Sequence, residues 1–351
     1  MRITARQLNR TLLRRQHLLE RRSATVLDEC RHLVGLQAQD NLPPFLSLAA
    51  RLDPFDPHEV TRGLEDRSLV RLLTMRGTVH LLGARDVGLR AWTASVHERE
   101  IGSSQVLGSV REVDRAAFLA ALDDVLAGGP LPQKAIGEAL APRFPAYTAV
   151  QLGQLARSAA PLVQLPPRGT WGGSGAVVYD HAARWTGLPL DAPPVEDVVR
   201  RYLTAFGPAR AADVTAWSGV TRLGPVLTAM HAAGELERHE DERGRALYDV
   251  PGGEVADAGE PAPVRLLGTY DNVWLSHADR DRVTEPSARS GWAPLPGGRV
   301  PSTLLADGWV VGLWVVTEGR VEVMSTLRPL TRRERDELAE ETARVEALLA
   351  G

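Results

Sequence analysis

The chain repeats one short pattern three times, and this repetition constrains its fold more than any other feature. In each copy a helical pattern leads into a strand, a turn made of arginine and glycine, and a second strand. Glycine supplies the positive φ that a tight hairpin turn needs. Helices followed by such a hairpin form the winged-helix plan, so the sequence predicts three winged-helix units in tandem. The three turns are Arg76-Gly77, Arg168-Gly169 and Arg243-Gly244.

Helical periodicity ahead of the second and third hairpins supports this plan. Apolar spacing predicts helices over 115–127, 133–140 and 148–158 in the second unit, and over 195–205, 211–217 and 223–233 in the third. Pro132 and Pro208 precede two of these helices, as is typical near a helix start. We therefore expect winged helices over 1–105, 110–190 and 194–250.

The end of the chain has a different character. Residues 251–263 are rich in proline, glycine and acidic residues, which indicates a linker. Thr331 is the expected N-cap of a closing helix over 330–349, with Glu334 three residues further on. We expect a small β-rich domain over 262–351, with strands over 264–270, 300–305, 309–317 and 321–325. The predicted fold class is α+β, mainly helical.

Composition and charge indicate an ordinary soluble protein. The 351 residues are 44% hydrophobic and 24% charged, and no apolar run reaches the ~18 residues of a membrane helix. Arginines near the N-terminus replace the apolar stretch of a secretion signal, so we expect a cytoplasmic protein. Cys30, the only cysteine, excludes an intrachain disulfide. Lysine occurs only at Lys134, in an ordinary amphipathic helix pattern, which disfavours a Schiff-base mechanism.

Positive charge is concentrated at the N-terminus. Residues 1–22 hold seven arginines and one acidic residue, Glu20. Four of the arginines are spaced by four positions and share one helix face without acidic partners in sequence. This face is either solvated or a stripe that contacts phosphates. Its members are Arg2, Arg6, Arg10 and Arg14.

Common catalytic motifs are absent. The sequence contains no phosphate-binding loop and no zinc-protease motif, and Gly173-Ser174-Gly175 lacks the spacing of a nucleophile elbow. The nine histidines are scattered, so we expect no metal site. The densest titratable group is better explained by loop capping and surface salt bridges than by catalysis. It comprises Asp271, His277, Asp279 and Asp281.

A pair of glutamines is more informative. A helical pattern over 25–34 stops at Gly35, and residues 36–39 then alternate apolar and polar side chains. In an extended segment, residues two apart share a face. Gln37 and Gln39 therefore converge, while Leu36 and Ala38 pack inward. By itself such a pair indicates either a hydrogen-bonding patch or a catalytic site.

Six segments resemble, in their order and spacing, the bacterial winged-helix DNA glycosylase family of AlkZ and YcaQ. The catalytic motif of that family is glutamine, an aliphatic residue, then glutamine or aspartate, and Gln37-Ala38-Gln39 resembles the AlkZ branch. The resemblance implies a concave, monomeric scaffold that binds duplex DNA and excises N7-alkylated purines. It also implies unhooking of interstrand crosslinks, as self-resistance in producers of DNA-alkylating antibiotics. The matching segments are residues 35–40, 75–80, 205–209, 266–271, 277–280 and 307–314.

The expected chemistry needs no cofactor. Alkylation at guanine N7 makes the base a good leaving group, so the enzyme has to stabilise a cationic sugar and deliver water to C1′. Neutral amides are not bases, but the oxygens and dipoles of Gln37 and Gln39 can position water and favour positive charge. Asp40 is expected to add negative potential. His80 is the first candidate if an acid or base proves necessary.

DNA binding is expected to depend on phosphate contacts. Besides the N-terminal arginines, the turn residues Arg76 and Arg168 are candidates, whereas three acidic residues weaken the case for Arg243. Trp309 is a conceivable wedge against the duplex, although a core tryptophan fits its sequence position better. A bulky adduct cannot easily rotate out of the duplex, which favours a shallow site.

Two other functions remain open at the level of sequence. Winged helices also occur in transcription regulators that bind an operator, but three units in one chain without a dimerisation coil argue against that role. The other alternative is a non-catalytic protein that only binds damaged DNA.

Overall fold

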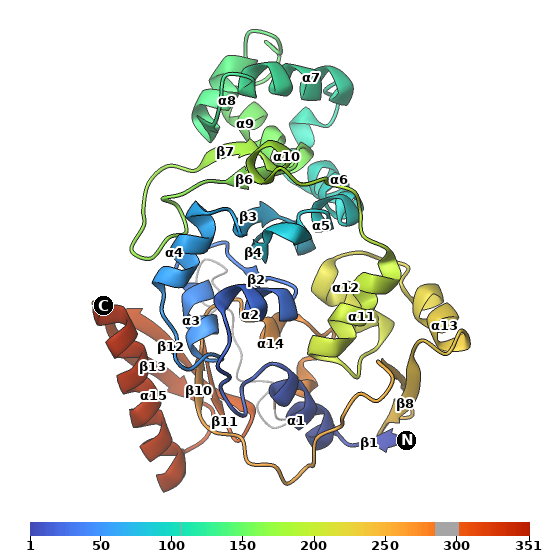
Figure 1. Cartoon of the computed structure of the whole chain (residues 1–351), viewed down its shortest axis with the longest axis vertical. Helices are drawn as coiled ribbons and strands as arrows, with labels where there is room; N and C mark the ends of the chain where they lie inside the picture. The colour runs from blue at the N-terminus through green and yellow to red at the C-terminus, as the bar shows by residue number, and fades with distance from the viewer. Residues whose placement is uncertain (106, 285–301) are drawn as a thin grey trace.

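The computed structural model describes residues 1–105, 107–284 and 302–351. Figure 1 shows the helices of the first unit near the middle of an elongated molecule, with the second unit at one end. The third unit and the C-terminal sheet with its long helix lie on the two sides of the opposite end (Figure 1). The α+β, mainly helical fold class predicted from the sequence is confirmed.

The first unit contains six short helices. Thr4 begins the first of them with a capping box, because its hydroxyl accepts from the backbone of Gln7 while the Gln7 side chain accepts from the backbone of Thr4. Thr25 caps the second helix through the backbone of Asp28. The six helices are α1 (Ala5–Arg15), α2 (Val26–His32), α3 (Pro43–Ala49), α4 (His58–Glu65), α5 (Leu89–Trp92) and α6 (Ala94–Ser103).

Helices of the second and third units agree with the sequence periodicity to within a few residues. The second unit contains α7 (Arg115–Leu126), α8 (Gln133–Leu140), α9 (Ala149–Ala159) and α10 (Ala182–Thr186). The third contains α11 (Val195–Phe206), α12 (Ala211–Ser218) and α13 (Gly224–Ala232). Apolar positions at helical spacing are buried in each unit, as in α11, where Tyr202, Leu203 and Phe206 are inaccessible to solvent.

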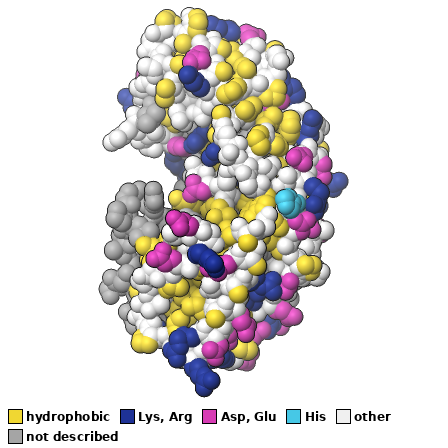
Figure 2. Space-filling view, turned by 90° about the vertical axis from the view of Figure 1, so that its left-hand side faces the viewer, with side chains coloured by type: hydrophobic (Ala, Val, Ile, Leu, Met, Phe, Trp, Pro, Cys, Tyr) yellow, Lys and Arg dark blue, Asp and Glu magenta, His cyan; other side chains and the backbone are white. Residues whose placement is uncertain are grey.

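One six-stranded antiparallel sheet joins the first two units. Its strand order is β2 (Leu36–Gln37), β4 (Val79–Gly83), β3 (Leu69–Leu73), β6 (Leu162–Gln164), β7 (Val178–His181) and β5 (Leu131–Pro132). Because β3 pairs with β6, the hairpins of the two units form a single layer. Figure 2 shows that the outline of the molecule is hollowed on one edge at about the height of this sheet. The division of the chain into four domains stays a prediction.

The second hairpin differs from the expected tight turn. Strands β6 and β7 are joined by residues 165–177, and Arg168-Gly169 lies inside this long connection instead of forming the turn. The prediction was wrong because a glycine with positive φ marks a local bend but does not fix the length of a loop. In the first unit the turn Met75–Gly77 does join β3 and β4, as predicted.

Two smaller sheets complete the fold. In the third unit β8 (Glu237–Asp241) and β9 (Ala246–Asp249) form the expected hairpin, and β1 (Arg2–Ile3) adds a parallel strand to it. The C-terminal sheet contains β10 (Arg265–Leu267), β11 (Ser302–Ala306), β12 (Trp309–Thr317) and β13 (Arg320–Thr326). Helix α15 (Arg332–Ala350) packs on it and begins at Thr331 with the predicted Glu334 capping box. Residues 300 and 301 of the predicted second strand lie outside the described residues.

A buried ion pair connects the first unit to the C-terminal region. The guanidinium of Arg51 donates two hydrogen bonds, of 2.7 and 2.8 Å, to the carboxylate of Asp271, and neither side chain is more than 1% exposed. The same carboxylate accepts from Ser47 and caps helix α14 (Asn272–Leu275) through the backbone of Val273. These contacts hold the pKa of Asp271 below its usual range despite its burial.

Replacing Arg51 by methionine leaves the Asp271 carboxylate buried without its cation, and we expect a loss of about 3–5 kcal/mol in the free energy of unfolding. Urea unfolding followed by circular dichroism measures the change. Arg62→Met is the matched control, because Arg62 pairs with Asp56 on the surface and such pairs contribute roughly 0–1 kcal/mol. Equal losses in the two variants would contradict this account.

Candidate active site

The paired glutamines lie at the edge of the six-stranded sheet, on the segment that the sequence predicted to be extended. Gly35 has a φ of 95° after the end of α2, and a Cβ at that position would collide with the Leu82 side chain. The chain then enters β2, where Leu36 faces Leu81 and Gln37 faces His80. Leu36 and Ala38 are buried, as expected. The inward packing of the two apolar side chains is therefore confirmed, but the strand ends at Gln37 and Gln39 lies in a bend, so the extended segment is shorter than predicted.

Gln37 and Gln39 have different environments. Gln37 is 7% exposed and its Oε1 accepts a hydrogen bond of 2.7 Å from Nη2 of Arg76. Gln39 is exposed, and its Oε1 lies 3.4 Å from the backbone nitrogen of Val79. Both side chains thus lie beside the start of β4. The geometry brings the two amides to one place, one partly enclosed and the other open to solvent.

Arg76 contacts Gln37 on the interior side of the site. Its Nη2 contacts both Oε1 of Gln37 and, at 3.3 Å, Nε2 of His80, while its Nη1 donates to the backbone carbonyl of Trp217 in α12. Burial lowers the pKa of Arg76 to about 10, so the side chain remains a cation at neutral pH. The sequence analysis placed Arg76 on a DNA phosphate. Three of its hydrogen bonds are directed to acceptors within the protein, and the phosphate contact stays a prediction.

His80 is a neutral imidazole in this environment. Its Nδ1 lies 2.9 Å from the backbone carbonyl of Thr78, which can only accept, so the proton is on Nδ1 and Nε2 accepts from Arg76. Burial, and then the charges of Arg76 and of His97, lower the pKa of His80 to about 3. With so low a pKa, the imidazole does not take up a second proton near neutral pH, so it is too weak a base for ordinary acid–base catalysis.

Arg71 is a contributor that sequence reasoning missed. It lies in β3, is 2% exposed, and donates from Nη2 to the carbonyl oxygen of Ala38 over 2.8 Å. It also contacts Oε1 of Gln164, on β6 of the second unit, at 3.3 Å. Desolvation and the nearby Arg168 lower the pKa of Arg71 to about 10. The one available signal was a charged residue inside the apolar run Leu69–Leu73.

The loop after β6 lies beside the same segment. A Cβ at Gly169 would collide with the Arg71 side chain, which places this part of the loop against β3. Asn41 donates to the carbonyl of Gly173 over 3.1 Å. Arg168 is partly exposed and its strongest recorded contact is a 3.4 Å hydrogen bond to Gly175. Arg168 thus lies on the loop that packs beside Arg71, and its role as a phosphate contact stays a prediction.

Asp40 lies at the solvent side of the glutamine segment. The side chain is exposed, unlike that of Gln37. Burial, and secondly the negative charge of Asp40, raise the pKa of Tyr270. Asp40 thus supplies negative potential near the C-terminal region, and its contribution to catalysis stays a prediction.

The N-terminal arginines are paired with acidic residues that are distant in sequence. Arg10 is fully buried and contacts Asp307 at 2.5 Å, and Arg6 contacts the same carboxylate at 2.9 Å. Arg14 pairs with Glu254 and Glu260, and Arg2 donates to the carbonyl of Glu242. The expectation of a stripe without acidic partners is wrong, because Glu254, Glu260 and Asp307 pack against α1. Arg10 in particular is not available to a phosphate.

The burial of three further candidate residues decides how each is interpreted. Trp309 is 8% exposed and packs in the core between the C-terminal sheet and α15, so the wedge interpretation is wrong and the core interpretation is confirmed. Asp271 caps a helix as predicted, but its salt bridge to Arg51 is buried and not superficial. His277 is buried as well, and desolvation lowers its pKa to about 3.

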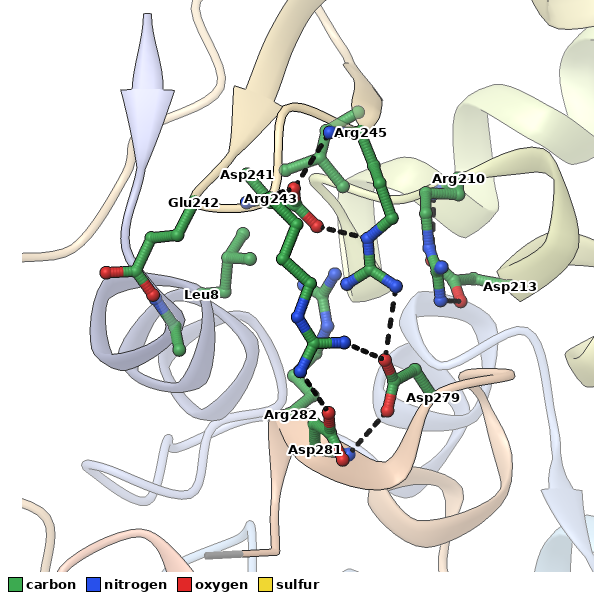
Figure 3. Close-up of a pocket in the computed structure, with 12 residues that line it drawn as sticks. Leu8, Arg210, Asp213, Asp241, Glu242, Arg243, Arg245, Asp279, Asp281 and Arg282 are labelled. Carbon is green, nitrogen blue, oxygen red and sulfur yellow. Dashed lines mark hydrogen bonds and ion pairs between the residues drawn. The ribbon is translucent and has the colours of Figure 1, made fainter. Parts of the chain in front are cut away.

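Asp279 and Asp281 line a pocket between α1, the third hairpin and the turn Arg280–Arg282 (Figure 3). Arg243 donates to Asp281 over 3.1 Å, and Arg245 donates to Asp279 over 3.3 Å. Figure 3 shows these side chains pointing toward one another across the pocket. Each of these two carboxylates has an arginine partner. Asp279 and Asp281 therefore belong to a salt-bridge network, as predicted.

Metal sites and membrane-spanning helices are both absent from the described residues. No group of three or more histidine, cysteine, aspartate or glutamate side chains in residues 1–105, 107–284 and 302–351 has a geometry that could hold a metal ion. In the same part of the chain, no helix is both long enough and apolar enough to cross a membrane.

Comparison with known proteins gives a consistent result. A family model described as DNA glycosylase AlkZ-like matches residues 30–348. The chain is 25% identical over 352 residues to the interstrand DNA cross-link repair glycosylase of Streptomyces sahachiroi, covering 95% of this chain and 93% of that protein. The solved structure of Streptomyces sahachiroi DNA glycosylase AlkZ shares the fold, with a TM-score of 0.83 at 22% identity over 100% of this chain and 98% of that one. The family model spans most of the chain, and the chain therefore belongs to the AlkZ-like family of DNA glycosylases.

Proposed function

We propose that this DNA glycosylase hydrolyses the N-glycosidic bond of N7-alkylated purines in duplex DNA, with Gln37 and Gln39 as its catalytic residues. The observation that carries the proposal is the pairing of two uncharged amides beside an imidazole that stays neutral. Such a site suits a substrate whose leaving group is already activated, because it contains a means of positioning but no base of useful strength.

The reaction balances without a protein nucleophile. The bond between C1′ and N9 breaks, and its electron pair moves into the purine, where it neutralises the positive charge created by N7 alkylation. The oxygen of a water molecule bonds to C1′, and the water proton passes to solvent. The amides hold the water and stabilise charge in the transition state. The products are a free alkylated base and an abasic site, as expected of a monofunctional enzyme.

Access to the site supports excision of a base that stays close to the duplex. Gln39 is exposed and Gln37 is enclosed by Arg76 and His80 on its inner side. A bulky or crosslinked adduct cannot rotate into a deep pocket without distorting both strands. We therefore propose that the substrates include interstrand crosslinks, the class named for the Streptomyces sahachiroi relative. Self-resistance to a DNA-alkylating natural product is the biological role that fits this substrate.

The proposed partner is double-stranded DNA, bound by a monomer without a cofactor. The alternative of an operator-binding regulator is set aside, because the chain belongs to a glycosylase family. The remaining alternative, a protein that binds damaged DNA without cutting the glycosidic bond, is decided by an assay for alkali-labile breaks. An oligonucleotide duplex with one N7-methylguanine is the probe. Strand breaks after alkali support the glycosylase, and retention of the duplex without breaks contradicts it.

Alanine at Gln37 or Gln39 tests the catalytic assignment. Loss of one positioned polar contact in the transition state typically costs about 10²–10³ in rate. We expect each substitution to slow single-turnover excision of N7-methylguanine by about this factor at saturating enzyme, with little change in affinity for the duplex. The effects should not multiply in the double variant, since both amides act on one transition state. Wild-type rates in both single variants would refute the assignment.

The pH profile tests whether a protein acid or base takes part. Neutral glutamines do not titrate, and His80, which faces Arg76 and His97, has a pKa of about 3. The single-turnover rate with N7-methylguanine should therefore be nearly flat between about pH 6 and 8.5. An inflection near ~6.5 would indicate an ordinary titrating histidine and contradict the proposal. A steep rise toward acid pH would show that the leaving base needs protonation.

Arg168→Ala tests the phosphate contact that the structure leaves available. If Arg168 neutralises one phosphate, the slope of log affinity against log salt concentration should shrink by about 0.9, equally for damaged and undamaged duplexes. Arg62→Ala is the control, since Arg62 is an exposed arginine held by Asp56 and its loss should leave the slope unchanged. An identical slope for wild type and Arg168→Ala would show that Arg168 contacts no phosphate and is only a solvated side chain.

A further inference from the structure

Arg76 determines how the amide of Gln37 is oriented. An amide oxygen and nitrogen look alike in shape, and their assignment normally depends on the surrounding hydrogen bonds. Here the neighbour is a guanidinium, which donates and never accepts. The atom of Gln37 that lies 2.7 Å from Nη2 of Arg76 must therefore be Oε1. It follows that Nε2, with its two N–H donors, is on the other branch of the amide.

The contacts of Arg76 are suited to holding this orientation. The two hydrogens of Nη2 serve two acceptors, Oε1 of Gln37 and Nε2 of His80, and Nη1 is tied to the carbonyl of Trp217. The backbone of Arg76 has a φ of 53°, in the left-handed region that non-glycine residues seldom adopt. Such a conformation persists only where the surroundings fix it. The guanidinium is therefore anchored at both ends of its planar fork.

The donors of Gln37 have no partner inside the protein. Within residues 1–105, 107–284 and 302–351, no acceptor takes a hydrogen bond from Nε2 of Gln37, although the residue is only 7% exposed. Nε2 is not one of the buried side-chain atoms that lack a partner, so this end of the amide is open to solvent and to a ligand. A ligand that offers an acceptor, such as a base or sugar oxygen of DNA, would satisfy it.

We propose that Arg76 is a positioning residue that fixes the amide of Gln37 so that Gln37 offers hydrogen-bond donors to the substrate, while Gln39 supplies the acceptor for water. This inference rests on the proposed glycosylase function and assigns a different role to each of the two glutamines. Oε1 of Gln39 is suited to the second role, because the side chain is exposed and the oxygen accepts only one long hydrogen bond, of 3.4 Å from the backbone nitrogen of Val79, which leaves a lone pair for water.

The charge of Arg76 gives an independent reason for this division. As the glycosidic bond breaks, the sugar gains positive charge and the purine gains electron density. A partly buried cation beside Gln37 opposes the first change and favours the second, and both effects are stronger than in open solvent. The side of the site near Arg76 and Gln37 is therefore complementary to the leaving base. Exposed Gln39, with Asp40 next to it in sequence, is complementary to the sugar and the attacking water.

A double-mutant cycle tests whether Arg76 acts through Gln37. Single-turnover excision of N7-methylguanine from a duplex is measured for wild type, Arg76→Met, Gln37→Ala and the double variant. Arg76→Met should slow excision roughly 10- to 100-fold, the usual effect of a misplaced catalytic group, and should slow the Gln37→Ala variant much less, because only the direct effect of its charge then remains. Affinity for the duplex and its salt dependence should not change. Multiplied effects, or a salt slope reduced by about 0.9 as for a lost phosphate contact, would overturn the proposal.

Arg90→Met is the matched control for the cycle. Arg90 is also a buried cation with a pKa lowered to about 10 by burial, and it donates to the carbonyl of Ser158 without contacting Gln37. Any effect of Arg90→Met on excision should multiply with that of Gln37→Ala, as expected for independent sites. If Arg90→Met slows excision in the wild-type background but has no effect in the Gln37→Ala background, the cycle does not single out Arg76 and the proposal fails.

Glutamate substitutions separate the two roles. Gln37→Glu keeps an oxygen for Arg76 but removes the N–H donors, so it should slow excision as much as Gln37→Ala does. Gln39→Glu keeps the acceptor and adds negative charge near the sugar, so it should retain a rate within about tenfold of wild type. The opposite ranking would show that Gln37 is the acceptor and would overturn the proposal.

Nuclear magnetic resonance tests the orientation without relying on activity. The side-chain amide signal of Gln37, assigned by its loss in Gln37→Ala, should be shifted from the signals of exposed glutamines in the wild-type protein. It should move toward them in Arg76→Met and stay in place in Arg90→Met. An unmoved signal in Arg76→Met would overturn the proposal. If wild type excises no N7-methylguanine, the proposed function fails, and this spectrum still decides whether Arg76 holds the amide.

Discussion

The antiparallel pairing of β2 with β4 is the constraint on which the candidate site depends. Only two residues, Leu36 and Gln37, form β2, and their register places Gln37 opposite His80. A slip by one residue would exchange the buried and the functional face, because successive side chains of a strand point in opposite directions. Gly35 at φ 95° and the hydrogen bond of 2.7 Å from Ala38 to Val79 fix the register on both sides. Backbone contacts thus hold the segment that carries the two glutamines.

Buried arginines connect that segment to the rest of the molecule. Arg71 binds the carbonyl of Ala38 and reaches Gln164 of the second unit, while Arg76 binds Gln37 and reaches Trp217 of the third. Each uses uncharged acceptors, which leaves its positive charge uncompensated by direct ion pairing among the described residues. This positive interior is compatible with DNA, whose phosphates attract it, and with a base that gains electron density.

Sequence patterns predicted most elements of the fold, because burial imposes a period on helices and strands. Helix α8 was placed to the residue, and the C-terminal strands and the Thr331 cap were anticipated from local features alone. The errors concern contacts between distant segments. Arg10 has no acidic neighbour in sequence, yet it forms an ion pair with Asp307, which lies 297 residues further along the chain. Arg71 interrupts an apolar run for a reason that only the fold reveals, since its partners lie 33 and 93 residues away. The extended start of the glutamine segment was predictable, but the orientation of its first amide was not.

The central claim is that two neutral amides suffice to hydrolyse the bond to an alkylated base. Mass spectrometry of the products from a duplex with one N7-methylguanine, with and without borohydride, tests this claim most directly. We expect one free N7-methylguanine for each abasic site, intact strands before alkali, and no borohydride-trapped protein on the DNA. Release should be lost when both Gln37 and Gln39 are alanine. A trapped covalent complex, or undiminished release by that double variant, would contradict the account.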